Sequence, residues 1–485
     1  MHRRGGAVAA GNPDTAGAAV QVLRAGGNAF DAAVAAGFAA AVAEPGLSSL
    51  GGGGFLLART AQGAETLVDF FVDAPGRGRD EGPGPPPLTA VTVRFSGADQ
   101  VFHAGWGSVA VPGCLNGYLH VHRKFGRLPL RHVVAPAQRL AADGVVLAPA
   151  QAVVLGLLEG IVTLTPEGRE VFAPRGRLVR AGDVVRNEHL AALLDQVADG
   201  RVRGFADPEL AAAMERAMTD AGGQVSAADL AGYQVVEREP LRITYRCARL
   251  TTNPPPSFGG GIVADGLADL DRHPLLDDSP EAYARLADVL VRISERHITG
   301  PASVVGTTHI SVVDAEGNVA AMTTSNGSCA GVFVPGTGVQ LNNVMGETDL
   351  HLGGLHTALA GVRIGSMMAP TIVDGDDGRS VALGSGGSER IRSTLLCLVA
   401  ALVDRRLPLA EALCAPRLHW DRATLQAEPA LGADVLARLA RARPLHVWPG
   451  RDLYFGGANA TVRHADGELE AVGDDRRGGA GVVLT

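Results

Sequence analysis

Thr307-Thr308-His309-Ile310-Ser311-Val312-Val313-Asp314 leads into a polar turn, Ala315-Glu316-Gly317-Asn318, and the chain returns as Val319-Ala320-Ala321-Met322-Thr323-Thr324-Ser325. Two strand-like halves around a turn that contains glycine predict a β-hairpin. If Val313 lies opposite Val319, Thr307 lies opposite Ser325, so that two hydroxyl groups face each other across the hairpin. A register slip of one residue would place Thr324 or Asn326 there instead.

Thr307 opens the first strand of this hairpin, and two interpretations fit that position. Threonine is common in strands because its branched side chain suits a pleated surface. Alternatively, the bond between Gly306 and Thr307 is a self-cleavage site, and Thr307 becomes a new N-terminus. A free α-amino group, whose pKa is about 7.7–8.0, could then take the proton of the hydroxyl on the same residue.

Two further segments favour self-cleavage. One runs from Gly26-Gly27-Asn28-Ala29-Phe30-Asp31 to Gly51-Gly52-Gly53-Gly54-Phe55, and the other contains Met368-Ala369-Pro370-Thr371 and Gly384-Ser385-Gly386-Gly387-Ser388. Together with the run from Thr307, they resemble the γ-glutamyltransferase family of N-terminal-nucleophile hydrolases, in the family's order and over nearly the whole chain. The resemblance implies an α+β fold, a four-layer αββα sandwich. It also implies cleavage into a large subunit, residues 1–306, and a small subunit, residues 307–485, which together form one domain.

The resemblance assigns the catalytic roles. Thr307 is the nucleophile through its hydroxyl and the base through its amine, Ser325 orients it, and the Gly386-Gly387 region stabilises the oxyanion. A helix expected from residue 389 would present unpaired N–H groups to that oxyanion. A Gly-rich turn with Ser388 as helix N-cap is the structural alternative. The family commonly has Gly-Ser-Pro-Gly-Gly-Ser here, so either Gly386/Gly387 or Gly387/Ser388 could supply the N–H pair.

The residues with which the family grips the glutamyl α-carboxylate and α-amine are largely replaced in this chain. Phe71 stands where the family has the carboxylate-binding arginine, so bidentate recognition of a carboxylate is lost. Glu347 stands at the position of the amine-binding aspartate. We therefore expect an apolar, aromatic or otherwise non-glutamyl acyl group. The candidate substrate-binding residues at the clamp positions are Phe71, Asn326, Val344, Glu347 and Ser366.

A polar segment after Val344 offers further candidate contacts. It carries Glu347, Asp349, His351 and His356, with Arg363 nearby. These side chains are of types that bind metals, but they show no defined ligand spacing, and a solvated loop is the alternative. We expect His351 or Arg363 to contact substrate, and we expect no metal and no cofactor.

Bulk properties exclude several classes of protein. The net charge of −8 gives no electrostatic reason to expect nucleic acid or an anionic membrane as partner. The five cysteines show no CxxC spacing, which favours a reducing compartment over a disulfide framework or zinc site. No apolar stretch follows the arginines near the N-terminus, and the longest apolar run, residues 32–43, is too short to span a bilayer. We therefore expect a cytoplasmic protein.

The remaining pattern predicts helices over residues 16–25, 29–43, 281–298 and 389–403, a mainly helical region from 115 to 230, and strands near 371–373 and 381–383. Exposed or irregular loops are expected over 75–87 and 347–361. The glycines at 51–54 precede a strand, not a helix, so a dinucleotide-binding motif is excluded.

These observations predict a self-processing hydrolase or acyltransferase that acts on a small-molecule amide or acyl substrate, with secondary metabolites among the candidates. Its two cleavage fragments would form a heterodimer. Three alternatives remain: ordinary γ-glutamyl transfer or glutathione hydrolysis, carbon–carbon bond hydrolysis in a natural-product pathway, and a catalytically inactive binding relative. The retained Thr307, Ser325 and glycines disfavour the last.

Overall fold

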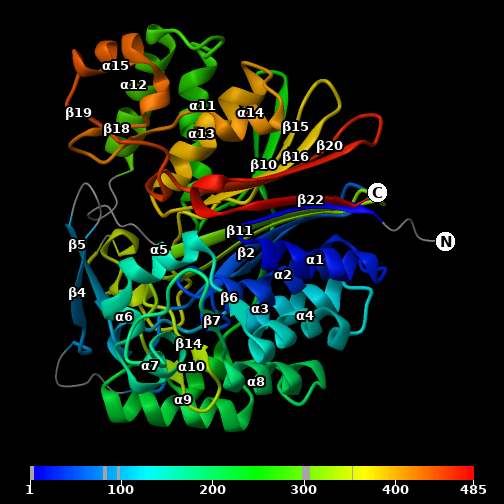
Figure 1. Ribbon diagram of the computed structural model, residues 1–485, viewed down its shortest axis with the longest axis vertical. Coiled ribbons are helices and arrows are strands. Elements are labelled where there is room, and N and C mark those ends of the chain that lie inside the picture. Colours follow the sequence, from blue (N-terminus) through cyan, green and yellow to red (C-terminus); the bar gives the residue numbers. More distant parts are fainter. Residues whose placement is uncertain (1–4, 80–84, 95–98, 298–305, 352, 485) are drawn as a thin grey trace.

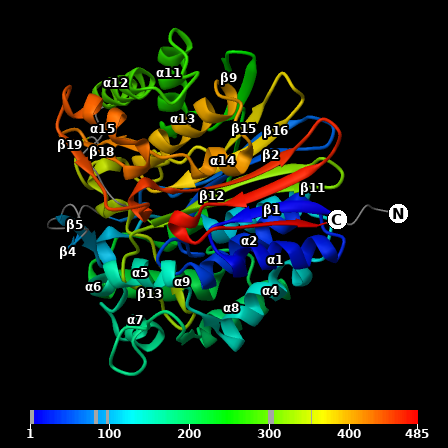
Figure 2. The ribbon, with the colours of Figure 1, turned by 45° about the horizontal axis from the view of Figure 1, so that its top comes forward.

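Two stacked β-sheets with helices on both outer faces form the molecule, as expected (Figures 1 and 2). The computed structural model describes residues 5–79, 85–94, 99–297, 306–351 and 353–484. Part of the expected loop over 75–87 and the last residue of the helix expected over 281–298 therefore lie outside the described residues. The four-layer αββα arrangement confirms the fold predicted from the sequence.

The first sheet has seven strands, and all of its pairings are antiparallel. In spatial order these are β22 (Ala480–Leu484), β1 (Gly6–Ala10), β11 (Gly306–Asp314), β12 (Val319–Gly327), β2 (Gly53–Arg59), β3 (Glu65–Phe70) and β8 (Val236–Arg238). The hairpin β11–β12 therefore lies in the middle of the sheet, between two strands from the N-terminal part of the chain.

The second sheet has six strands, again antiparallel. They are β21 (Leu469–Gly473), β20 (Gly457–Arg463), β16 (Ser380–Gly386), β15 (Thr371–Asp374), β10 (Ala248–Thr252) and β9 (Leu241–Tyr245). Smaller sheets lie outside the two layers and comprise β4 (Thr89–Arg94), β5 (Asp99–Ala104), β6 (Val145–Val146), β7 (Val184–Val185), β13 (Phe333–Val334), β14 (Val339–Gln340), β17 (Leu418–Trp420), β18 (Leu425–Ala427) and β19 (Leu445–Val447).

Helices cover the outer face of each sheet (Figure 1). On the side of the first sheet lie α1 (Pro13–Arg24), α2 (Ala29–Ala43), α3 (Cys114–Phe125), α4 (Leu130–Asp143), α5 (Pro149–Leu157), α6 (Glu159–Val162), α7 (Pro166–Phe172), α8 (Glu188–Ala198), α9 (Pro208–Ala221) and α10 (Ala227–Gly232). On the side of the second sheet lie α11 (Gly259–Asp271), α12 (Pro280–Arg296), α13 (Arg390–Val403), α14 (Leu409–Cys414) and α15 (Ala433–Ala440).

The helix α2 forms where the sequence predicts it, because Asn28 and Asp31 make a reciprocal capping box at its start. Fourteen of its fifteen residues are buried, and most of them are alanine. The helix is apolar all round because it is buried on every side. Its small side chains let it lie close to the sheet. Its core partners include Val8, Ile310 and Val312 of the first sheet.

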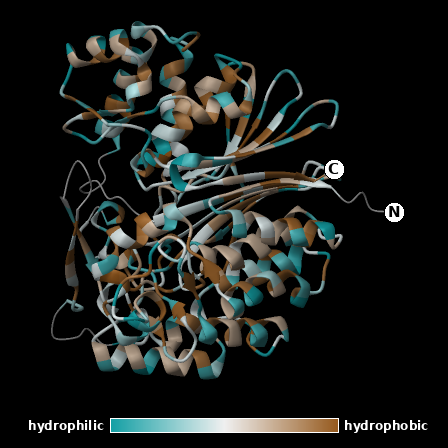
Figure 3. Ribbon diagram, in the orientation of Figure 1, coloured by the Kyte–Doolittle hydropathy of each residue, from teal (hydrophilic) through white to brown (hydrophobic). Residues whose placement is uncertain are grey.

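A second apolar layer fills the space between the sheets and extends under α11–α13. Phe55 and Leu57 contribute from the first sheet, and Leu250, Ile372 and Leu383 from the second. Figure 3 shows the strands of this layer as mainly hydrophobic. The two sheets are thereby held face to face, with the ends of β11 and β16 next to each other.

The register of the central hairpin is the predicted one. Val313 pairs with Val319 and Thr307 pairs with Ser325, so the alternatives with Thr324 or Asn326 are wrong. One irregularity follows: Gly306 pairs with Gly327, so the register shifts at the Gly306–Thr307 bond and Asn326 is the extra residue of a β-bulge. Bulges re-aim side chains near functional sites.

Candidate active site

Thr307 and Ser325 meet at the start of β11, inside the molecule. The Thr307 side chain is 4% exposed, and its Oγ1 donates a hydrogen bond of 3.1 Å to Ser325 Oγ. Ser325 Oγ in turn donates 2.6 Å to the carbonyl oxygen of Gly306 and accepts 3.0 Å from the Gly327 N–H. A single hydroxyl therefore connects the candidate nucleophile to the carbonyl that it would attack.

This connection suits proton transfer during attack. A proton that leaves Thr307 Oγ1 has an acceptor in Ser325 Oγ, and the Ser325 proton points at the oxygen on which negative charge would develop. The Gly327 N–H adds a donor that fixes the Ser325 hydroxyl. The geometry is that of the intact chain before cleavage.

Gly306 is confined by backbone on both sides. A Cβ atom at this position would overlap the carbonyl oxygens of Gly46 and Gly327. Glycine at the residue before Thr307 is therefore required by the close approach of two other backbone segments. Sequence reasoning named Gly306 only as the cleavage position and missed this packing, because Gly46 is far away in the chain.

The Gly386–Ser388 turn approaches Thr307 from the second sheet. Gly386 ends β16 and pairs with Gly457, and a Cβ on Gly386 would overlap the Thr307 carbonyl. Gly387 and Ser388 have positive φ angles of 119° and 50°. Neither of their N–H groups is hydrogen-bonded to another residue among those that the structure describes. Of the two N–H pairs left open by the sequence, this geometry favours Gly387/Ser388.

Ser388 is not the helix N-cap that the structural alternative required. The residue before α13 is Glu389, which makes no side-chain capping hydrogen bond. Ser388 Oγ instead donates 2.9 Å to Asp349 Oδ2. The turn is thereby tied to the polar segment formed by η2 (Val344–Gly346) and η3 (Thr348–Leu350).

Two carboxyl groups of this segment are buried close to the site. A Cβ on Gly327 would overlap Glu347 Oε1, so Glu347 lies directly against the end of β12. Burial, and secondly the neighbouring Asp349, raise the pKa of Glu347 well above its usual value. Burial and the nearby Glu389 raise the pKa of Asp349 to about 6. Both groups therefore favour the protonated form more than an exposed carboxyl does.

His351 supports this segment from within. Its Nε2 lies 2.9 Å from the Val344 carbonyl oxygen, and burial lowers the pKa of its imidazole. Val344 is itself buried, as are Asn326 and Ser366. Asn326 Nδ2 donates to the Leu341 carbonyl at 3.4 Å, and Ser366 Oγ accepts from the Met368 N–H at 3.1 Å. These side chains shape the backbone around the site.

Phe71 lies in the apolar layer between the sheets. Its side chain is 2% exposed and stacks on Phe55 with 5.6 Å between the ring centroids. The expectation that Phe71 binds substrate is disfavoured by this placement in the intact chain. The aromatic ring instead fills core volume.

Arg363 is occupied by other partners. Its Nε donates 2.5 Å to Asp73 Oδ1, Nη1 contacts Asp69 through both the carboxylate and the carbonyl oxygen, and Nη2 donates 2.7 Å to the Gln234 carbonyl. The guanidinium thus ties together the two aspartates that flank Phe71. The expectation that Arg363 contacts substrate is disfavoured, because its donor groups are already used.

The acidic and histidine residues of the polar segment do not form a metal site. Among the described residues, no group of three or more His, Cys, Asp or Glu side chains is placed to hold a metal ion.

Within the same part of the chain, no helix has the length and apolar character needed to cross a bilayer.

Arg477 is a neighbour of Thr307 that the sequence did not reveal. It belongs to η6 (Asp475–Arg477), and its Nη1 donates to the Thr307 carbonyl oxygen at 3.4 Å. The charged run Asp474-Asp475-Arg476-Arg477 close to the C-terminal end was the available signal. A separation of 170 residues hid the contact.

Comparison with known proteins identifies the class to which this fold and site belong. A family model described as Gamma-glutamyltranspeptidase matches residues 15–298 and 296–484. The chain therefore belongs to the γ-glutamyltranspeptidase family of N-terminal-nucleophile hydrolases, as the sequence motifs predicted.

Two relatives show the range of names within the family. Acylase ACY 1 proenzyme of Pseudomonas sp. (strain SE83) is 31% identical over 99% of this chain and 94% of its own length. Glutathione hydrolase proenzyme of Escherichia coli (strain K12) is 29% identical over 94% of this chain and 88% of its own. Among solved structures, cephalosporin acylase from Bacillus halodurans shares the fold, with a TM-score of 0.86, 24% identity, and coverage of 99% and 96%.

Proposed function

We propose that this chain is a self-processing N-terminal threonine hydrolase or acyltransferase. Cleavage after Gly306 would give residues 1–306 and 307–485, which stay together as a heterodimer. The observation that carries the proposal is the hydrogen-bond path from Thr307 Oγ1 through Ser325 Oγ to the Gly306 carbonyl. That the named relatives are proenzymes is consistent with processing.

The maturation step balances with the groups in place. Thr307 Oγ1 bonds to the Gly306 carbonyl carbon, and the Gly306–Thr307 C–N bond breaks, which leaves an ester and a free Thr307 amine. The hydroxyl proton passes through Ser325 to the leaving amine. Water then hydrolyses the ester, releasing the Gly306 carboxylate and restoring the Thr307 hydroxyl.

Turnover would use the same atoms with a new base. The free Thr307 amine accepts the hydroxyl proton, and Oγ1 attacks the carbonyl carbon of an amide or acyl substrate. The Gly387 and Ser388 N–H groups, which are free of protein partners among the described residues, would receive the oxyanion. Water or another nucleophile then takes the acyl group from Thr307.

We further propose a non-glutamyl acyl group. Phe71 is core packing, and the guanidinium of Arg363 is held by Asp69 and Asp73, so neither supports binding of a substrate α-carboxylate. Glu347 and Asp349 place two carboxyl groups close to Ser325 and the Gly386–Ser388 turn. A carboxyl group does not supply the positive charge that a substrate α-carboxylate would need as a partner. The family includes an enzyme named as an acylase, which is consistent with such a substrate.

The decisive experiment is the fate of the chain on a denaturing gel. The wild-type protein should give two fragments, and the smaller should begin with Thr307-Thr308-His309 on N-terminal sequencing. Thr307→Ala should remain one chain and be inactive, whereas Thr307→Ser, which keeps a hydroxyl, should still cleave. Wild-type protein that is active while still intact would overturn the proposal.

A further inference from the structure

Arg477 carries a buried charge without an acidic partner close by. Its side chain is enclosed, and no carboxylate of the described residues lies within 4 Å of its guanidinium. Burying a charge is costly unless it is paired, so an enclosed cation of this kind calls for an explanation. The adjacent arginine shows the contrast, because Arg476 is paired with both Glu428 and Asp474.

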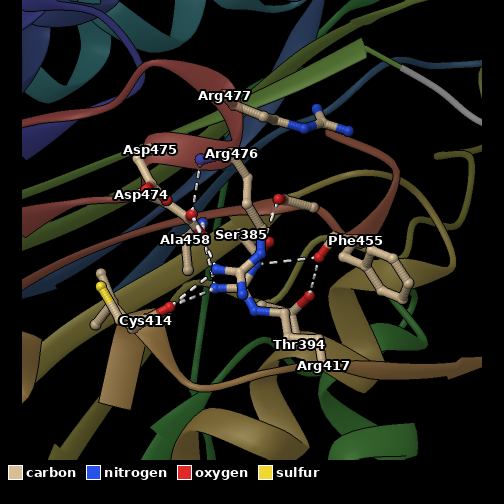
Figure 4. A network of polar contacts seen from close by, with 12 residues as sticks. Ser385, Thr394, Cys414, Arg417, Phe455, Ala458, Asp474, Asp475, Arg476 and Arg477 are labelled. Carbon is tan, nitrogen blue, oxygen red and sulfur yellow. Dashed lines mark hydrogen bonds and ion pairs between the residues drawn. The ribbon is translucent and has the colours of Figure 1, made fainter. Parts of the chain in front are cut away.

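Figure 4 shows that the side chains of Arg476 and Arg477 point in different directions. Arg417 and Arg476 converge on Asp474, with 2.5 Å between Arg417 Nη2 and Asp474 Oδ2. Arg477 points away from that network. The network therefore fixes the backbone of η6 and leaves the Arg477 side chain free to reach elsewhere.

The Arg477 guanidinium reaches the nucleophile and the oxyanion turn. Nη1 donates 3.4 Å to the Thr307 carbonyl, and Nε donates 3.2 Å to the Leu453 carbonyl. A Cβ built on Gly386 would stand 3.3 Å from Nη1, and one on Gly387 3.1 Å from Nη2. The aliphatic stem lies over Gly457, the residue that pairs with Gly386. The cation is thus seated against Thr307 and both glycines at once.

We propose that Arg477 is a positioning residue that holds the Thr307 backbone and, after cleavage, favours the neutral form of the Thr307 amine. This inference rests on the proposed role of Thr307. A positive charge beside an amine disfavours the ammonium form, and only the neutral amine can accept the proton of the Thr307 hydroxyl. The same charge favours an oxyanion at the Gly387–Ser388 turn.

Other charged or titratable groups surround this position and set the background for the effect of Arg477. Burial first, and then the Arg390 guanidinium, lower the pKa of Arg477 to about 10, so it stays charged at neutral pH. Glu44 at the end of α2 lies within range of that charge. Burial lowers the pKa of His309 to about 3, so this neighbour on β11 is neutral. The charged or titratable groups within range of Arg477 or of the site are Glu44, His309, Glu347, Asp349, Glu389, Arg390, Arg417, Asp452, Tyr454 and Asp474.

The test compares Arg477→Met, which removes the charge, with Arg477→Lys, which keeps a charge on a different head group. The readout is the rate of Thr307 acylation by p-nitrophenyl acetate between pH 5 and 10. The release of nitrophenol in this step is the signal that is measured. The midpoint of the acid limb reports protonation of the base. The exposed Arg463 of β20, changed to Met, controls for loss of one arginine.

We expect the midpoint of the acid limb to rise by about one pH unit in Arg477→Met and by less in Arg477→Lys. At a pH below both midpoints, a shift of one unit slows acylation roughly tenfold. Arg463→Met should match the wild type. A mature Arg477→Met protein with the wild-type midpoint overturns the proposal, as does an Arg477→Lys shift as large as that of Arg477→Met.

The design stays decisive if Arg477→Met fails to mature. In that case Arg477→Gln, which also removes the charge but keeps hydrogen-bond donors, takes its place: a midpoint higher than that of Arg477→Lys supports the role of the charge, and the wild-type midpoint overturns it. Thr307→Ala separates this inference from the proposed function. If Thr307→Ala releases nitrophenol as fast as the wild type, the nucleophile itself is wrong, whatever Arg477 does.

Discussion

Ser325 is the residue on which the proposed cleavage depends. It receives the hydrogen bond of the Thr307 hydroxyl and donates its own to the Gly306 carbonyl, so its loss breaks both contacts. The hairpin pattern alone predicted that Ser325 faces Thr307, because alternation along two strands and a short turn leave little freedom of register. The second contact could not be predicted, since it depends on a bulge at the scissile bond.

Ser325→Ala should slow self-cleavage by roughly 5- to 150-fold, which corresponds to about 1–3 kcal/mol for a hydrogen bond to a reacting group. Ser325→Thr keeps the hydroxyl and should retain most of the rate. The measurement is the time course of fragment formation after synthesis, on denaturing gels. Equal rates for the alanine variant and the wild type would show that the proton takes another path.

Glutathione and simple γ-glutamyl anilides should be poor substrates. Their α-carboxylate would find Phe71 in the core and Arg363 bound to two aspartates, and an unpaired desolvated carboxylate reduces kcat/KM by about a hundredfold or more. The check compares a γ-glutamyl anilide with anilides of uncharged and aromatic acids. Efficient turnover of the γ-glutamyl compound would refute this specificity.

An arginine placed at position 71 should not give efficient γ-glutamyl turnover. In Phe71→Arg the new guanidinium would replace a ring that stacks on Phe55 in the core, so the variant should also unfold more readily than the wild type. The substitution at Phe71 was visible in the sequence, but its burial was not. Residue type does not reveal whether an aromatic ring lines a pocket or fills the layer between two sheets.

Among the elements, the segment from η2 to η3 couples the two halves of the site. Glu347 lies against the end of β12, Asp349 accepts a hydrogen bond from Ser388, and His351 contacts the Val344 carbonyl. In the sequence this segment is a polar cluster, for which a solvated loop was the expected structure. The structure buries its carboxyl groups, which is why their pKa values rise rather than staying near those of exposed acids.

Asp349→Asn should change how stability depends on pH. The pKa of Asp349 is raised to about 6 in the folded chain, against about 3.9 when unfolded, so the folded state binds the proton more tightly. The free energy of unfolding therefore falls as pH rises from about 4 to about 6, by roughly 2–3 kcal/mol from this group. The Asn variant should lack that fall while its amide oxygen still accepts from Ser388.

The measurement is urea unfolding at pH 4, 5, 6 and 7 in a Thr307→Ala background, where both proteins stay single chains. Asp466→Asn removes one exposed carboxylate and serves as the control. If Asp349→Asn and its parent lose stability in parallel over this range, Asp349 is not the group that holds the proton.

At the scale of the whole molecule, the two proposed fragments are interleaved rather than juxtaposed. In the first sheet, β11 and β12 of the smaller fragment lie between β1 and β2 of the larger one, and β22 pairs on the other side of β1. The second sheet mixes them again, because β15 pairs with β10. The family motifs predicted one domain, yet only the strand order shows why the proposed cleavage would leave it whole.

The cleaved protein should therefore migrate as one species in size-exclusion chromatography and unfold in one cooperative transition. Fluorescence and far-UV circular dichroism should report the same midpoint, because separating the fragments requires breaking several antiparallel ladders at once. The fragments should part only in denaturant. Separate elution of the two in plain buffer would contradict the strand order.

The pairing of Gly6 with Leu484 places the two ends of the described chain in neighbouring strands (Figure 1). A short linker could therefore join them, and new ends could be opened between Gly306 and Thr307. Such a circular permutant would begin at Thr307 once its initiator methionine is removed. Its nucleophile would exist from synthesis onward, so catalysis could be studied in a chain that never has to cut itself.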